Sequence, residues 1–296
     1  MSVTETAPVA APSATDALAS RPDRPEYGVR RFDGVNWLGV WTLYKKEVRR
    51  FLKVAFQTVL APVISTLLFL LVFVAAWGDR PPINVEGTLV PFLAFLPPGL
   101  IMMAVLNNAF ANSSSSLIIG KVQGNIVDVL MPPLSASELT AAFVLGAATR
   151  GLMVGAVTAV TCYLFVGGSV PLTIASPAAL LFFAVAASLM LAMAGVLAGV
   201  WAEKFDQLAA VTNFLVTPLA MLSGTFFSVK ADNIPDFVAT ISHFNPFFYA
   251  IDGFRYGVIG ASDAPVLLGA AVMIGVNAAL YFVCYLVLKS GWRLKS

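Results

Sequence analysis

Long apolar runs alternate along the chain with short polar segments. A helix needs roughly 20 apolar residues to cross the hydrocarbon core of a bilayer, and six runs have about that length. The runs are continuous and do not alternate between apolar and polar positions, which favours helices over the strands of a membrane barrel. The predicted fold class is therefore an all-α integral membrane protein with six transmembrane helices. The expected spans are residues 55–77, 89–111, 139–166, 177–201, 208–227 and 265–288.

The composition supports this fold class. Of the 296 residues, 58% are hydrophobic and 11% are charged, and the mean hydropathy is +0.84. A soluble globular protein carries about 25% charged residues, so most of this surface faces something other than water. Cys162 and Cys284 lie inside predicted spans and are expected to be small buried hydrophobes, not a disulfide or metal ligands. Because His243 is the single histidine, no His-rich metal centre is expected.

Polar and helix-breaking residues interrupt the second predicted span. Pro97, Pro98 and Gly99 fall inside it, which predicts a broken or strongly kinked helix. Asn107 and Asn108 follow near its far end. Amide side chains are costly against lipid, so both are candidates for lining a translocation pathway or facing other helices.

Arg150 is a charged residue inside the third predicted span. A charge at the bilayer centre costs roughly 2.5 kcal/mol or more. Arg150 lies about a dozen residues into the span, which places it near mid-depth at about 1.5 Å per residue. It is therefore a candidate for lining the pathway or meeting an anionic headgroup. Two structural alternatives stay open, because its side chain can snorkel toward the surface or pair with Glu138.

Close helix packing is indicated in the fourth predicted span. Gly195 and Gly199 have the GxxxG spacing within a stretch rich in small residues. Small residues at this spacing let two helix backbones approach closely in a membrane. The motif is weak on its own, because it occurs often in spans rich in Gly and Ala.

The N-terminal region precedes the first span. Residues 1–34 are rich in Ala, Pro, Ser and Thr and lack the apolar core of a signal peptide, which predicts a disordered tail. Residues 35–53 combine Trp, Leu and Phe with a basic face. This pattern predicts an amphipathic helix in the headgroup layer. The alternative is a solvated basic extension of the first span.

The polar segment at residues 120–135 separates the second and third spans, so it must lie outside the hydrocarbon core. We predict a short helix there, because apolar residues recur on one helical face. The expected membrane-facing residues are Val122, Ile126, Val129 and Leu130, and the expected outward polar residues are Lys121, Gln123, Asn125 and Asp128. An ordinary solvated loop is the alternative. Glu203 and Asp206 lie in a second charged turn, which is either a further contact surface or a simple turn.

The segment at residues 230–260 is too polar to span a membrane and too apolar for a solvated loop. It predicts a pair of short helices that dip into the membrane face. Asp252 and Arg255 are three residues apart on one of them, so an ion pair is sterically reasonable. A structural role for this pair is favoured over substrate contact. The aromatic residues here suit either an exit gate for an amphipathic substrate or packing at the interface.

Charge distribution predicts the orientation. Lys and Arg concentrate in the N-terminal region, in the segments at 113–138 and 202–207, and at the C-terminus. The opposite side has only Arg80, Lys230 and Arg255. Positive residues in short loops mark the cytoplasmic side. Both termini and the 120–135 segment are therefore predicted to be cytoplasmic, and the 230–260 segment external.

Several of these segments resemble a known family in both sequence and order. Residues 96–103 (LPPGLIMM) resemble the start of its second span, and residues 120–138 resemble its coupling helix. Asn245-Pro246-Phe247-Phe248-Tyr249 and Gly253-Phe254-Arg255-Tyr256-Gly257 match its external signature. From residue 35 onward, the chain resembles an ABC-2 type transporter permease. Within that family it is similar to the branch of drug and lipo-oligosaccharide exporters.

The resemblance implies the permease subunit of a bacterial inner-membrane exporter with an amphipathic substrate. It implies a homodimer surrounded by lipid, with separate ABC ATPase subunits docked at the coupling helix. The chain contains no GxxxxGK[ST] phosphate loop, so ATP would be used by the partner. The expected subunit is non-catalytic and binds no cofactor, metal or nucleic acid.

Two other function classes remain as alternatives. A secondary transporter or channel would act without an ATPase. It would need acidic or histidine relays in its spans, and it often shows two similar halves. A membrane-embedded enzyme would need a carboxylate pair, a His cluster or an activated Ser at membrane depth, and the predicted spans show none.

Overall fold

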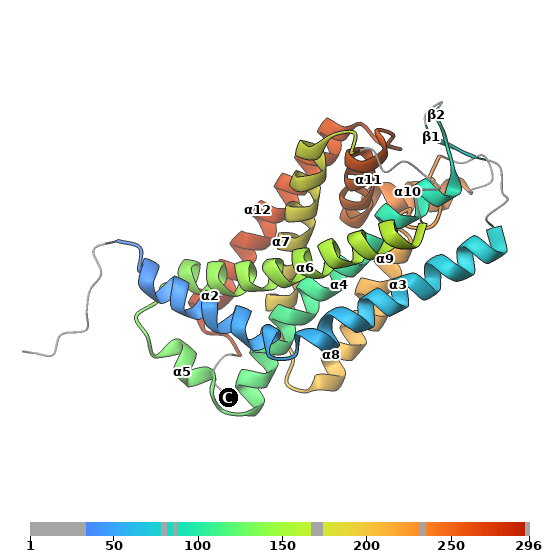
Figure 1. The fold of residues 1–296 in the computed structure, drawn as a ribbon. Coiled ribbons are helices and arrows are strands. Elements are labelled where there is room, and N and C mark those ends of the chain that lie inside the picture. The colour runs from blue at the N-terminus through green and yellow to red at the C-terminus, as the bar shows by residue number, and fades with distance from the viewer. Residues whose placement is uncertain (1–33, 78–81, 86–87, 167–173, 231–234, 294–296) are drawn as a thin grey trace, which may run out of the picture. The chain divides into compact units, whose positions relative to one another are not determined.

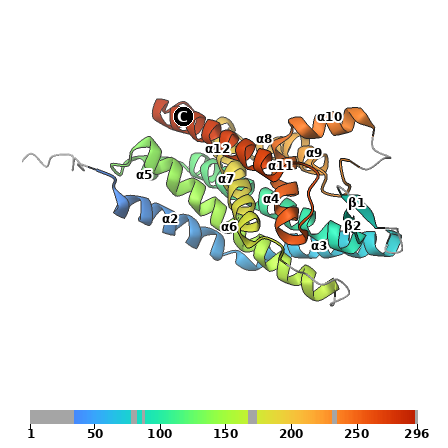
Figure 2. The same cartoon turned by 90° about the horizontal axis from the view of Figure 1, so that it is seen from above.

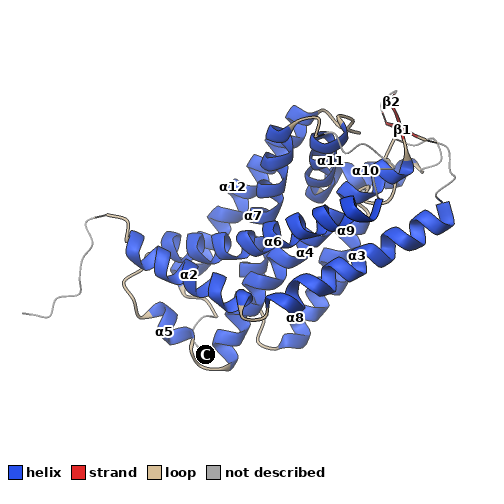
Figure 3. Ribbon diagram, in the orientation of Figure 1, coloured by secondary structure: helices blue, strands red, loops and turns tan. Residues whose placement is uncertain are grey.

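The computed structural model describes residues 34–77, 82–85, 88–166, 174–230 and 235–293. The chain divides into two units, Met1–Val35 and Asn36–Ser296. The predicted disordered tail belongs to the first unit and lies outside the described residues apart from its last position. The described residues of the second unit form helices and one small β-hairpin (Figures 1 and 3).

Within the described residues, five helices are long and apolar enough to cross a membrane. Each falls on one of the predicted spans. They are α3 (Ala55–Trp77), α4 (Phe92–Val122), α6 (Ala136–Val166), α7 (Pro177–Trp201) and α12 (Val266–Ser290). On α3 and α12, large apolar side chains such as Phe56 and Leu267 are exposed, as expected for helices surrounded by lipid.

The span predicted at residues 208–227 is shorter and less regular than expected. Its helical part consists of α8 (Phe205–Val211), the π-helical turn η1 (Thr212–Val216) and α9 (Thr217–Met221). Pro218 lies in the first turn of α9 and has no backbone N–H to donate, so a regular ladder is interrupted at this point. Turns follow Met221 instead of further helix.

Helices α4 and α6 are longer than their predicted spans. Each has 31 residues, which corresponds to about 46 Å at 1.5 Å per residue, against about 30 Å for a hydrocarbon core. Of the break or strong kink predicted at Pro97 and Pro98, the break is wrong, because α4 continues through both residues, and the kink stays a prediction. The neighbouring chain approaches α4 closely at this point, since a Cβ on Gly99 would lie only 2.5 Å from the Thr225 carbonyl oxygen.

A β-hairpin replaces part of the polar loop predicted before the second span. Strand β1 (Ile83–Val85) pairs antiparallel with β2 (Thr88–Val90), with Ile83 opposite Val90. The second strand takes up the first residues of the predicted span, so the helix begins only after Pro91. Val85 and Val90 are buried against Phe95. This small apolar cluster fixes the hairpin on the end of α4.

Helix α4 lies between α6 and α7, and both neighbours pack closely on it (Figures 1 and 2). On α7, a Cβ at Gly195 would lie 2.5 Å from the Phe110 carbonyl oxygen, and one at Gly199 would lie 2.9 Å from that of Ser114. The close helix approach predicted from these two glycines is therefore confirmed. Gly155 of α6 meets Val105 of α4 in the same way.

The described segments of the second unit group at two opposite ends (Figures 1 and 2). The short helix α5 (Ile126–Leu130), the turn after α7 and the C-terminal residues of α12 share one end, called here the α5 end. The hairpin, α10 (Asp236–Phe244) and α11 (Pro246–Ile259) share the other, called the hairpin end. Helix α2 (Trp37–Leu52) packs along the first turns of α6 from the α5 end inward.

The glycine contacts lead to a matched stability prediction. Gly195→Ala is expected to lower the melting temperature of the purified protein, because overpacking a tight contact costs about 1–3 kcal/mol. Gly275→Ala on α12 is the control, since nothing lies within 4 Å of the position its Cβ would take. Thermal unfolding in detergent measures both. Equal melting temperatures for the two variants would contradict the proposed packing of α4 on α7.

Candidate functional site

The segment at residues 120–135 contains the predicted short helix. It is α5, and it begins at Ile126, after α4 has ended at Val122. Ile126 and Val129 are buried, and Ile126 lies against Gly120. Val122 was predicted to face the membrane side with them, but it is exposed, because it is the last residue of α4 and not part of α5. Of the four residues predicted to face the membrane side, Ile126 and Val129 are therefore buried, Leu130 is partly buried and Val122 is exposed.

Lys121 was predicted to present an outward polar contact, but its ammonium group is engaged within the protein. It donates hydrogen bonds to the carbonyl oxygens of Val200 (2.6 Å) and Ala202 (2.7 Å). Lysine is well suited to this position, since its charge complements the free carbonyls at a helix C-terminus. Lys121 therefore ties the end of α4 to the end of α7.

The remaining predicted residues form an exposed surface at the α5 end. We define the α5 surface as Val122, Gln123, Asn125, Val127, Asp128 and Met131, all of which are exposed. Val127 and Met131 are four residues apart, and Met131 is 75% exposed. Sequence patterning placed only polar residues on this outward face and missed its apolar members. Their exposure at an end of the bundle, away from the apolar flanks, suits contact with another protein.

The charged turn after α7 is held by its own contacts. The Gln207 side-chain oxygen accepts from the backbone N–H of Glu203 at 2.7 Å. The Glu203 carboxylate lies 3.5 Å from Arg293 Nη1, which also donates to the Trp201 carbonyl. Glu203 and Asp206 both stay exposed. The turn thus has a structural function, and its predicted second contact surface stays a prediction.

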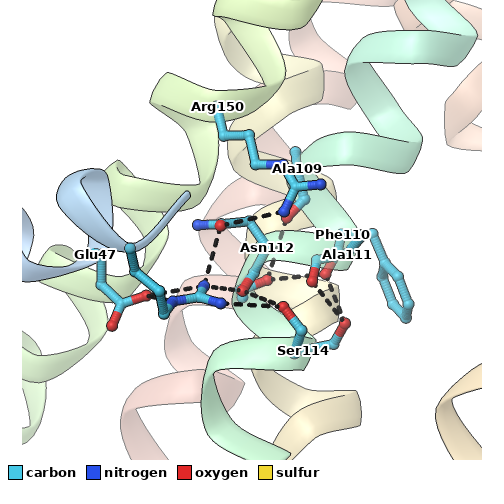
Figure 4. Close-up of polar contacts among 10 residues, drawn as sticks. Glu47, Ala109, Phe110, Ala111, Asn112, Ser114 and Arg150 are labelled. Carbon is cyan, nitrogen blue, oxygen red and sulfur yellow. Dashed lines mark hydrogen bonds and ion pairs between the residues drawn. The ribbon is translucent and has the colours of Figure 1, made fainter. Parts of the chain in front are cut away.

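A buried polar cluster lies where α2, α4 and α6 meet (Figure 4). The Arg50 guanidinium of α2 pairs with Glu47 at 3.1 Å and donates to Asn112 Oδ1 at 3.0 Å. Arg150 of α6 reaches Asn108 Oδ1 at 3.2 Å and the same Asn112 oxygen at 3.5 Å. The structure therefore brings predicted pathway residues Arg150 and Asn108 together with two residues of α2.

These contacts decide one of the alternatives for Arg150. It does not pair with Glu138, whose carboxylate instead accepts from the backbone N–H groups of Asn36 and Ser135. Its expected mid-depth position stays a prediction, and Arg150 lies near the middle of the 31-residue α6. Arg50 lies one turn before the start of α3 at Ala55, where that apolar span begins. Arg150 thus shares its Asn112 contact with a residue that precedes the first apolar span.

Asn107, the other pathway candidate, is partly buried beside this cluster on α4. Its side-chain oxygen is buried and has no hydrogen-bond partner among the described residues. Asn108 is buried more deeply and also donates back to the Ala104 carbonyl at 3.0 Å. Both amides thus face protein. This agrees with the prediction, which was based on the unfavourable free energy of exposing an amide side chain to lipid.

At the hairpin end, Arg255 is fully buried in α11. It donates to the Gly224 carbonyl oxygen at 2.6 Å, and its guanidinium carbon lies 3.8 Å from the centre of the Phe95 ring. The predicted ion pair with Asp252 is present at 3.8 Å. Arg255 therefore joins α11 to α4 and to the turn after α9, which supports the structural role favoured from the sequence.

Two aspartates complete this part of the fold. Asp252 accepts from the backbone N–H groups of Asp263 (2.8 Å) and Ala264 (3.0 Å). Asp263 accepts from the Ser228 hydroxyl (2.6 Å) and from Val229 N–H (3.0 Å). Burial raises the pKa of Asp252 to about 6, against the opposing influence of Arg255 and the backbone donors. Asp263 was not among the residues predicted from the sequence. The signal that could have indicated it is its position just before Pro265 and the last span.

The other predicted residues of the external element shape α11. Asn245 caps the helix by accepting from Phe247 N–H at 3.1 Å, and Pro246 occupies its first turn. Gly253 packs on the Phe183 ring of α7. Tyr249 and Phe254 are buried, and Tyr256 is partly buried. This sequence signature therefore encodes a buried helix packed on α7, not a row of exposed ligands.

His243 and the aromatic residues around it divide into two groups. His243 lies edge-on to the buried Phe248 ring, with 5.1 Å between ring centres. Phe237 and Phe244 of α10 are exposed instead. Packing thus accounts for the residues that face the core, and α10 keeps an apolar outer face at the hairpin end. No group of three or more potential metal ligands occurs in the described part of the chain.

The apolar helices around a largely buried α4, with a short surface helix at one end, define a multi-pass membrane protein. The sequence model of the ABC-2 type transporter family matches residues 39–259. The chain therefore belongs to the ABC-2 type transporter family.

Two relatives extend this result. The chain is 34% identical over 261 residues to the inner membrane transport permease YadH of Escherichia coli K12, covering 88% of this chain and 98% of YadH. It is 25% identical over 243 residues to nodulation protein J of Rhizobium leguminosarum bv. viciae, covering 81% and 88%. Both alignments extend over most of the helical unit, so the similarity is not confined to one segment.

The buried Arg255 leads to a second prediction. Arg255→Ala is expected to destabilise the protein by about 3–5 kcal/mol, because it leaves Asp252 buried without its cation. The double variant Arg255→Leu with Asp252→Asn should recover part of that loss, since it removes both charges. Thermal unfolding measures the difference. A melting temperature unchanged in Arg255→Ala, together with lost transport, would instead indicate substrate contact.

Proposed function

We propose that this chain is the permease subunit of an ABC exporter of the bacterial inner membrane, driven by a separate ATPase subunit that docks on the α5 surface. Membership of the ABC-2 family and the name of the YadH relative support the transport role. The observation that carries the docking claim is the α5 surface itself. It combines exposed Val127 and Met131 with Asp128, at one end of the bundle.

The internal contacts of the α5 end explain how force at this surface would reach the spans. Val129 and Ile126 are buried beneath it, so α5 cannot move independently of the end of α4. Lys121 then ties α4 to α7, and Arg293 ties the end of α12 to α7. A push on α5 would thus act on three long helices together.

In this proposal the α5 end faces the cytoplasm, with both termini, because the surplus of Lys and Arg lies there. The hairpin end is then external, and the α8–α9 segment serves as the sixth span. Lipid surrounds the bundle, and two copies form a homodimer around the pathway. The exposed Phe56 of α3 and Phe214 of η1 are available for lipid or for the second copy.

The substrate proposed for this exporter is amphipathic: a lipid, a lipid-linked glycan or a hydrophobic drug. Large apolar side chains exposed along the spans, such as Phe214, give the acyl or ring portion a surface to follow. The buried cluster at Arg50 and Arg150 gives a polar headgroup a place outside the lipid. ATP would bind only to the partner, and this chain would carry out no chemistry.

A charge reversal on the α5 surface tests this function. Asp128→Arg is expected to uncouple the complex in proteoliposomes, lowering both ATP-driven transport and transport-stimulated ATP hydrolysis by about tenfold, since a reversed charge at an interface costs on the order of 1.4 kcal/mol or more. Asp128 is exposed, and its side chain makes no hydrogen bond or ion pair with the residues that the structure describes, so folding should be unchanged.

Thr88→Arg is the matched control, because Thr88 is exposed at the hairpin end. It should transport and hydrolyse ATP at the wild-type rates. Normal coupling in Asp128→Arg, or equal losses in the two variants, would count against docking at the α5 surface.

A further inference from the structure

The buried cluster of α2, α4 and α6 has an imbalance of charge. The guanidinium groups of Arg50 and Arg150 both converge on one neutral atom, Asn112 Oδ1, at 3.0 and 3.5 Å. Glu47 is the single carboxylate in contact with either of them among the described residues, and it pairs with Arg50. Two cations thus share one amide oxygen at the point where a buried pair would normally have an anion.

The cluster also has donors without acceptors. Arg150 Nε and Asn112 Nδ2 are buried and have no hydrogen-bond partner among the described residues; the acceptor Glu47 Oε1 is also buried and unpaired, on the carboxylate that already pairs with Arg50. A buried donor without a partner is costly, and a charged one more so. The other atoms that Arg150 contacts are neutral amide oxygens, so Glu47 does not relieve this deficit. An anion with several oxygens would satisfy these donors together.

The position of the cluster restricts what that anion is. Arg50 lies about one turn before α3 begins its apolar span, and from this we infer that the cluster is level with the edge of the hydrocarbon core. The Arg50 side chain is 27% exposed, and Ala111, which precedes Asn112 on α4, is exposed. The cluster can therefore be reached from outside at the depth where lipid phosphates lie. Arginine pairs with phosphate through two parallel hydrogen bonds.

We propose that Arg50, Asn112 and Arg150 form a binding site for the phosphate of an anionic amphiphile. The phosphate oxygens would accept from both guanidiniums and from the Asn112 amide, and the acyl chains would extend into the bilayer along α3. The phosphate belongs either to a resident phospholipid or to the carried substrate. The second case rests on the proposed export function, and the site itself does not.

Lipid binding to the purified full-length chain tests the site. Native mass spectrometry would follow titration with short-chain phosphatidylglycerol and with phosphatidylcholine, which has the same chains but no net charge. We expect phosphatidylglycerol to bind at least about tenfold more tightly, as for a charge-assisted pair of hydrogen bonds. Equal affinities for the two lipids would overturn the proposal.

Asn112→Asp is the sharpest variant. It places a carboxylate of nearly the same shape where the two guanidiniums converge, so the protein supplies its own anion. We expect this variant to lose about tenfold in phosphatidylglycerol affinity, while its melting temperature rises or is unchanged. The reason is that the new carboxylate accepts charge-assisted hydrogen bonds from both guanidiniums, in place of the lipid phosphate. Wild-type lipid preference in this variant would overturn the proposal.

Two arginine variants complete the test. Arg150→Gln should lose the same preference, and it keeps the proposal falsifiable if Asn112→Asp does not fold. Arg49→Gln is the matched control, since Arg49 is an exposed arginine on the same helix. It should bind phosphatidylglycerol within about twofold of wild type, as for an exposed charge. A loss in Arg49→Gln equal to that in Arg150→Gln would indicate general surface attraction and overturn the site.

The source of the phosphate is distinguished in vesicles that contain the chain, its co-purified ATPase and fluorescent phosphatidylglycerol. ATP-driven movement of the labelled lipid between leaflets, lost in Arg150→Gln, would identify the bound molecule as cargo. Tight binding without movement would identify a resident lipid. If no amphiphile is transported while phosphatidylglycerol still binds, the export function fails and the site stands.

Discussion

Helix α4 can lie at the centre of this protein only because its neighbours present glycines to it. Gly195 and Gly199 of α7, and Gly155 of α6, leave room for the backbone and side chains of α4. Without a hydrophobic driving force between helices in lipid, such close packing is a main source of association. The polar contacts at the α5 end depend on this approach, because Lys121 joins the end of α4 to the end of α7.

The two ends of the bundle use polar groups differently. At the hairpin end, Asp252, Arg255 and Asp263 are all buried and fasten three segments to one another through charged and backbone hydrogen bonds. At the α5 end, Lys121 fastens the helices from within, and the outer surface keeps exposed polar and apolar residues. One end is thus built for rigidity, and the other offers a surface for a partner.

Apolar run length predicted the spans of α3, α7 and α12 closely, since proline or polar residues bound each run. It underestimated the lengths of α4 and α6, because hydropathy does not detect helical residues beyond the apolar run. In α4, the buried polar residues Ser113 and Ser114 continue the helix in this way. The short helix α5 was predictable from spacing. The convergence of Arg50 and Arg150 on Asn112 was not, since these residues are distant in sequence and meet only through tertiary packing.

The central claim is that an ATP-hydrolysing partner docks on the α5 surface. Site-specific photo-crosslinking in the intact complex tests it most directly, with the photoreactive residue at Met131 of the α5 end or at Thr88 of the hairpin end. Both positions are exposed, so both can report a neighbour. We predict a crosslink from position 131, and none from position 88, to a subunit that contains an ATP-binding phosphate loop. Transport with no such crosslink from position 131, or with one from position 88, would contradict the account.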